Sequence, residues 1–209
     1  MLKKFVFILL ISAFASEGFA QKILEREWDA EGVEKLFLRC NSVYQISITS
    51  EKTDKILVHT EVAGENYEQL LLATELKNDK LTIETSYAPF FKPENDKLAA
   101  HKIMAIEMRL VIPEGLQVSI ESKLASVEVE GSYRFLSVAL EEGNCELQNF
   151  KGDASLQTKK GDIIVFARTD VSGTGLSTNG TVENHLDFNG SLLIEAESIY
   201  GNIRLLQTK

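Results

Sequence analysis

Short stretches of alternating apolar and polar residues recur through the C-terminal half of this chain. From about residue 114 onward, each stretch ends in a small residue, one further residue and an apolar residue. The five apolar residues that mark the repeats lie 18, 18, 19 and 21 residues apart: Val127, Cys145, Ile163, Val182 and Ile203. A period near 20 residues, made of short strands and tight turns, is typical of a solenoid in which each coil stacks on the preceding one.

Glycine marks the corners of these repeats, because a turn that needs positive φ accepts glycine at little steric cost. Apolar pairs such as Cys145 and Leu147 then face one shared core. The fourth repeat departs from the pattern at Asn184, where we expect a bulge over His185-Leu186. Gly173-Thr174-Gly175 lacks the strand-to-helix context of a nucleotide-binding loop, and we interpret it as a turn between coils.

Longer alternating strands precede the repeats, between residues 33 and 112. Asn78-Asp79 separates two such stretches, 70–77 and 80–86, and this spacing predicts a β-hairpin. The turn Pro113-Glu114-Gly115 separates this region from the repeats.

These patterns predict an all-β chain without a long helix. The expected architecture is a parallel β-solenoid, or β-helix, of short glycine-cornered coils that follows a strand-rich N-terminal region. We place the strand-rich part at residues 21–113 and the solenoid repeats at residues 114–209.

The first twenty residues have the pattern of a secretory signal peptide. Lys3 and Lys4 precede the apolar run Phe5–Ala15, and Gly18-Phe19-Ala20 supplies the small residues of a cleavage site. The alternative, a permanent membrane anchor, needs a longer apolar run. We therefore expect cleavage after Ala20, export to the periplasm or cell surface, and no stable membrane insertion afterwards.

Net charge limits the possible partners, and the positions of the two cysteines bear on whether they form a disulfide. The chain has a net charge of −9, and binding to nucleic acid needs a basic face, so we expect no nucleic-acid partner. Two cysteines in an exported chain raise the alternative of a disulfide. Cys40 and Cys145 both lie at core-facing positions of alternating stretches, so we predict buried free thiols.

The stretch Arg109-Leu-Val-Ile-Pro-Glu-Gly-Leu-Gln-Val118, followed by repeated glycine-cornered coils, resembles the DUF4097-type "putative adhesin" domain of bacterial envelopes. It is also similar to the related GIN domain at the head of autotransporter adhesins. The resemblance spans about residues 33–209, and it departs at Ala125-Ser126, where the first coil would carry glycine. It implies an envelope protein with adhesin-like architecture, and it implies no catalytic residues.

The sequence contains none of the common catalytic or metal-binding motifs that we sought, so we predict a non-enzyme without cofactor or metal. His59, His101 and His185 lack the spacing of metal ligands and are interpreted as surface histidines. Aspartates near the coil corners are interpreted as turn formers. These are Asp153, Asp162, Asp170 and Asp187. A polysaccharide-acting β-helix enzyme is the catalytic alternative, and it would require converging charged groups in a groove.

Tyr87, Phe90 and Phe91 are the candidate partner-contact residues, because aromatics on a proline-flanked loop can anchor a partner. In the alternative interpretation they fold back and cap one open end of the solenoid. We expect a non-catalytic envelope protein, either an adhesin-like surface or a scaffold, that binds another envelope protein or a glycan. The other non-catalytic alternative is a periplasmic accessory in envelope-stress signalling.

Overall fold

The computed structural model describes residues 21–64, 67–89 and 105–208. Within these ranges the chain is all-β, as predicted, and its single helical element is a 3₁₀ turn, η1 (Tyr67–Gln69). In the described residues there is no helix long and apolar enough to span a membrane. The strands in chain order are β1 (Gln21–Asp29), β2 (Lys35–Arg39), β3 (Gln45–Glu51), β4 (Lys55–Ala63), β5 (Leu70–Lys77), β6 (Lys80–Tyr87), β7 (Ala105–Pro113), β8 (Gln117–Ser122), β9 (Ser126–Glu142), β10 (Cys145–Lys160), β11 (Ile163–Ala167), β12 (Val171–Ser177), β13 (Val182–Asn184), β14 (Leu192–Tyr200) and β15 (Ile203–Gln207).

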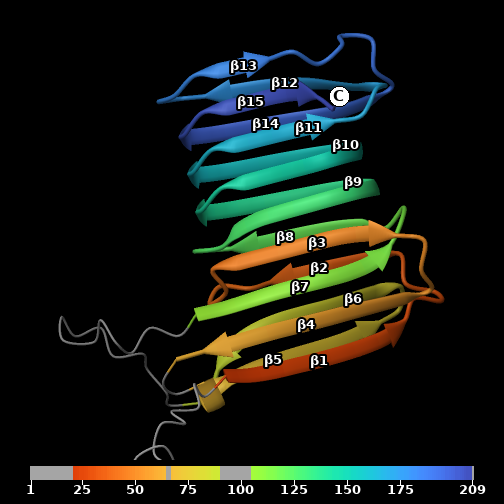
Figure 1. The fold of residues 1–209 in the computed structure, drawn as a ribbon, viewed down its shortest axis with the longest axis vertical. Helices are drawn as coiled ribbons and strands as arrows, with labels where there is room; N and C mark the ends of the chain where they lie inside the picture. The colour runs from red at the N-terminus through yellow and green to blue at the C-terminus, as the bar shows by residue number, and fades with distance from the viewer. Residues whose placement is uncertain (1–20, 65–66, 90–104, 209) are drawn as a thin grey trace, which may run out of the picture.

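The strands stack in two series (Figure 1), and buried side chains from both form one hydrophobic core. The first series runs β1-β4-β7-β3-β9-β10-β11-β15-β13. The second runs β5-β6-β2-β8-β9-β10-β14-β12. Strands β9 and β10 belong to both, because their first halves pair in the first series and their second halves in the second. In the first series every pair from β3 to β13 is parallel, and in the second every pair from β2 to β12 is parallel.

Strands β9 and β10 change series at bends in their backbones. Gly131 and Gly152 adopt positive φ angles of 108° and 153°, and Asn149 adopts 49°. The register of β9 against β10 shifts between Gln148 and Asp153, which is the irregularity that a β-bulge produces. These local breaks let each long strand leave one series and continue in the other.

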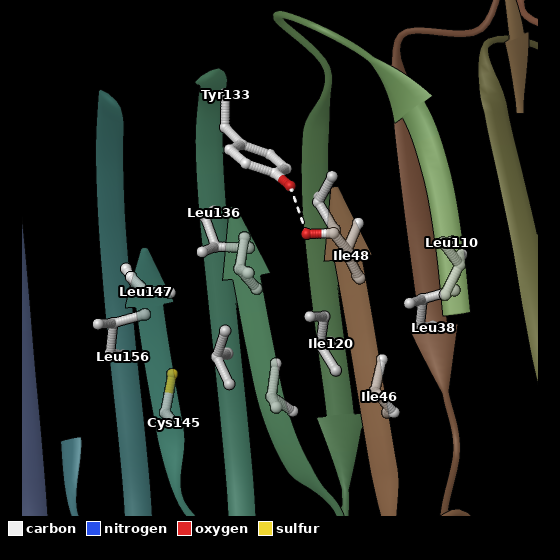
Figure 2. Close-up of a cluster of buried hydrophobic side chains, with 14 of the residues drawn as sticks. Leu38, Ile46, Ile48, Leu110, Ile120, Tyr133, Leu136, Cys145, Leu147 and Leu156 are labelled. Carbon is white, nitrogen blue, oxygen red and sulfur yellow. Dashed lines mark hydrogen bonds between the residues drawn. The ribbon is translucent and has the colours of Figure 1, made fainter. Parts of the chain in front are cut away.

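The core consists of in-register ladders of apolar side chains (Figure 2). Cys145 pairs with Val127 on one side and Ile163 on the other, and all three are buried. The inward positions of the first three repeats are therefore as predicted. Tyr133 lies among them, stacks on Phe150 at 5.7 Å between ring centroids, and donates a hydrogen bond to a backbone oxygen. Its hydroxyl is thus satisfied despite burial.

The prediction that each coil stacks on the preceding one is wrong for the last two repeats. Ile163 pairs with Ile203, and Ile203 pairs in turn with Val182. The segment of β14 and β15 therefore lies between the third repeat and the fourth. Ile203 is fully buried, whereas Val182 is 43% exposed. The short β13 has Asn184 in place of a second apolar residue, so it suits the edge of the stack rather than its interior.

Two local predictions in the fourth repeat are also wrong. Gly173 and Gly175 lie inside β12, not in a turn. A Cβ atom at Gly173 would lie 2.9 Å from the side chains of Leu186 and Leu205, so glycine makes room where the core narrows. The expected bulge at His185-Leu186 does not form within a strand, because β13 ends at Asn184 and these two residues follow it.

The N-terminal part contributes to the same stack. The predicted hairpin is confirmed as β5 and β6, with Asn78 at a φ of 57° in the turn. Strand β2 pairs with β8, and strand β3 pairs with β9. Strands that precede Pro113 in sequence are therefore hydrogen-bonded to strands that follow it. The division into two parts at residue 113 stays a prediction.

Both cysteines are free and buried, as predicted, and Cys40 Sγ lies 3.9 Å from Met108 Sδ. Burial raises the pKa of each thiol to about 12, because the thiolate is poorly solvated in the core. We expect no alkylation of Cys40 or Cys145 by iodoacetamide at pH 8 in the native protein, and two adducts in guanidinium chloride. Intact-mass spectrometry measures both states. A native adduct would contradict the burial of that thiol, provided that the protein stays folded by circular dichroism.

Candidate functional site

The predicted aromatic contact residues are only partly within the described structure. Tyr87 ends β6, pairs with Leu70 of β5, and packs half-buried against the core. Phe90 and Phe91 lie outside the described residues. Both interpretations of the three aromatics, as a partner site and as a cap, therefore stay predictions.

The two histidines that the structure describes occupy separate surface positions. His59 lies on β4, with its ring nitrogens 3.2 Å from Glu25 and 2.9 Å from Glu61. His185 lies 3.3 Å from Glu183 at the opposite end of the stack, and His101 is outside the described residues. In the part of the chain that the structure describes, no group of three or more His, Cys, Asp or Glu side chains could hold a metal ion.

Asp170 and Asp187 form turns, as predicted, whereas Asp153 lies inside strand β10. Asp162 belongs to a hydrogen-bonded ladder at the corner of the stack that sequence reasoning missed. Asn144 Oδ1 accepts from the backbone N–H of Asp162 at 2.9 Å, and Asp162 Oδ1 accepts from that of Asn202 at 2.7 Å. Asn202 Oδ1 accepts in turn from the N–H of Thr181 at 3.0 Å. The sequence signal was a short polar residue directly before each apolar mark. The side chains of this ladder hydrogen-bond to the backbone of the next coil and stabilise the corner of the stack. We therefore look for a binding site elsewhere on the surface.

A groove crosses the outer surface of the second series and encloses about 550 Å³. Its central row consists of exposed side chains that are successive register partners on six neighbouring strands. This central row contains Arg39, Glu121, Ala139, Gln157, Glu197 and Leu176. The groove therefore runs across the strands rather than along one of them.

A second row, nearer the corner of the stack, lines the other side of the groove. This corner row contains Lys123, Glu141, Lys159, Ile199 and Thr178. Glu141 and Lys159 lie on β9 and β10 between paired residues, with Lys159 Nζ 3.6 Å from Glu141 Oε1. Strand alternation explains the two rows, because side chains two positions apart point to the same face of a sheet.

The groove has balanced charge. Three cations, Arg39, Lys123 and Lys159, face three carboxylates, those of Glu121, Glu141 and Glu197. Arg39 Nε lies 3.3 Å from Glu121 Oε2, and Arg39 Nη1 lies 3.0 Å from Glu84 Oε1 at the end of the row. These pairs are exposed, so each contributes little to stability and mainly orders the side chains.

The middle of the groove combines a small apolar floor with unpaired polar groups. Ala139 lies between the longer Glu121 and Gln157, which leaves a depression in the sheet surface. Among the described residues, the side chains of Gln157 and Glu197 have no protein hydrogen-bond partner, so their polar atoms face solvent. Leu176, 64% exposed, and Ile199, 43% exposed, add apolar surface at one end. Such a surface can bind a partner.

Sequence reasoning did not find this groove. Its central row joins residues as far apart as Arg39 and Glu197, and their alignment depends on strand registers that the repeat pattern does not contain. The one local signal was Ala139, a small apolar residue at an outward position of a long alternating strand.

No family model matches this chain, and no curated protein matches it. Among solved structures, that of "a putative cell adhesion protein" from Clostridium sporogenes superposes with a TM-score of 0.66. It is 18% identical, and the match covers 90% of this chain and 100% of the other. The structure of "a putative adhesin" from Bacteroides fragilis gives a TM-score of 0.44 at 12% identity, over 90% of this chain and 99% of the other. The Clostridium structure shows a shared fold, whereas the specific resemblance to the DUF4097-type domain stays a prediction.

Proposed function

We propose that this protein is an exported, non-catalytic binding protein of the cell envelope, with an adhesin-like surface whose contact site is the groove. The observation that carries the proposal is the continuous central row across six strands, which presents an ordered set of polar and apolar groups to solvent. The fold shared with a protein described as "a putative cell adhesion protein" supports the same class. The leader-like residues 1–20 support export.

The proposal includes a β-solenoid as the framework of this surface. Its support is the parallel, in-register pairing of Val127, Cys145 and Ile163, each one repeat after the other. In this solenoid, β14 and β15 form a coil that lies in space between the third repeat and the terminal strands β12 and β13. A stack of this kind places equivalent outward residues of successive coils in rows, which gives an extended binding surface.

The test is a pull-down with immobilised residues 21–209 against an envelope extract of the host, with protein and polysaccharide fractions assayed separately. We expect saturable capture of one component. Ala139→Arg, which places a long side chain in the depression, should reduce this capture at least tenfold. Thr49→Arg adds the same side chain beside Glu130 on the outer surface of the first series and is the matched control. Capture that is equal in both variants would contradict the groove as the contact site.

A periplasmic accessory in envelope-stress signalling remains the alternative of the same non-catalytic class. The two roles differ in location. Protease added to intact cells should degrade a surface adhesin and leave a periplasmic protein untouched. The periplasmic role predicts full protection until the outer envelope is opened.

A further inference from the structure

We propose that the groove binds an extended, electrically neutral glycan, whose chain lies along the central row with about one sugar over each strand. This inference rests on the proposed function and specifies its ligand class. Three features of the groove carry it: its repeat distance, its charge balance and its combination of polar and apolar groups.

The repeat distance of the groove matches a polymer of sugars. Neighbouring strands lie about 4.8 Å apart, so the five intervals from Arg39 to Leu176 span about 24 Å. The length of one pyranose unit in an extended glycan is close to the interval between strands. Each sugar would therefore meet an equivalent backbone position and one member of the central row.

The charge balance selects a neutral ligand. A polyanionic glycan would approach Glu121, Glu141 and Glu197, and a polycation would approach the three basic side chains, so either would meet repulsion in the groove. Arg39 and Lys159 are already paired with carboxylates, which lowers their attraction for a further anion. A neutral chain meets no such penalty.

The polar groups in the middle of the groove suit hydroxyl-rich ligands. The Gln157 amide offers both a donor and an acceptor, and the Glu197 carboxylate offers acceptors. The Ala139 floor, with Leu176 and Ile199 beyond it, can contact the C–H faces of the sugars. The row therefore offers both hydrogen-bonding groups and apolar surface, and a sugar ring, with its hydroxyl groups and C–H faces, can use both.

An extended peptide fits the groove less well. The groove crosses strands whose backbone groups are already paired with their neighbours, so a peptide cannot add there as a further strand. Its lining residues include no aromatic side chain, the residue type that most often anchors a protein partner. A glycan binds through its hydroxyl groups and C–H faces and does not need to add as a strand.

Isothermal titration calorimetry with defined oligosaccharides tests this inference. The probes are linear neutral series, β-1,4-glucan, β-1,4-mannan and β-1,3-glucan, from disaccharide to octasaccharide, with oligogalacturonates as the acidic comparison. We expect at least one neutral series to bind, with affinity that rises up to about the hexasaccharide, the length that fills about 24 Å, and then levels off. Binding should change less than twofold between low and physiological salt, because no net charge is neutralised.

The variants assign the binding to the groove. Ala139→Arg should abolish it, and Gln157→Ala should weaken it about five- to tenfold, while Thr49→Arg should leave it unchanged. Circular dichroism confirms that each variant is folded. Tighter binding of oligogalacturonates, affinity independent of chain length, or no binding of any neutral series would each overturn the glycan inference.

The two proposals fail in different ways. Groove-dependent capture of a protein in the pull-down, without glycan binding, would overturn the glycan inference and leave the proposed binding function standing. An empty pull-down together with empty titrations would overturn both.

Discussion

Replacing Ile163 with Asp is expected to unfold the protein. Ile163 is completely buried and pairs with Cys145 on one side and Ile203 on the other, in the middle of the core ladder. A carboxylate there would lose its hydration without gaining a partner. We expect a loss of roughly 4–5 kcal/mol or more, which is comparable to the whole stability of many domains. Guanidinium unfolding followed by circular dichroism measures it.

The neighbouring residue provides the matched control. Ile164 points outward from the same strand and lies between Glu146 and Arg204. Ile164→Asp introduces the same carboxylate where water and Arg204 can stabilise it, so we expect a change within about 1 kcal/mol. Comparable losses in both variants, or a loss confined to Ile164→Asp, would contradict the inward and outward assignment of β11.

Replacing Gly161 with Ala is expected to cause the second large loss of stability. A Cβ atom at Gly161 would lie 1.9 Å from the backbone oxygen of Gly143 in the preceding coil. Gly161 also has a φ of 153°, which side chains rarely adopt. Because the obstacle is backbone, the two coils would have to separate at their corner. We expect a loss of roughly 3 kcal/mol, from overpacking together with backbone strain, measured by denaturant unfolding.

Gly32→Ala separates these two contributions. Gly32 has a positive φ of 78°, but an added Cβ would have no atom within 4 Å. This variant should therefore show the strain alone, roughly 1 kcal/mol. If the Gly161 and Gly32 variants lost equal stability, close stacking of the corners would not be the reason for glycine at position 161.

Residue types at repeated positions predicted much of the fold because they report local environment. Alternation identified the inward faces of β9, β10 and β11, and the position of Asn78-Asp79 identified the β5–β6 hairpin. Glycine positions predicted the turns less well, because glycine has three different structural roles in this chain. At Gly161 it allows close stacking of corners, at Gly131 it bends a strand, and at Gly173 it makes space inside the core. From the sequence alone, a glycine that makes space in the core cannot be distinguished from a glycine in a turn, because the side chains that face it are not known.

The candidate site depended on information that the repeats do not contain. Sequential stacking would have placed Leu176 directly beside Gln157 in the outer row. Insertion of β14 instead places Glu197 between them, and so sets the order of polar and apolar groups in the groove. Likewise, Arg39 meets Glu121 only because β2 pairs with β8 across 82 residues of sequence.

The sequence by itself therefore determined which side chains of β9, β10 and β11 face the core, the position of the β5–β6 hairpin, and the all-β character of the described residues. These features depend on the two-residue period of a strand and on the backbone freedom of individual residues. Only the tertiary structure decided which strands became neighbours. That choice depends on how well the apolar face of each strand fills the core. Strand β15, with the fully buried Ile203 and Leu205, pairs with β11, and β13, which has only one apolar residue, lies at the edge. The groove is a consequence of this order.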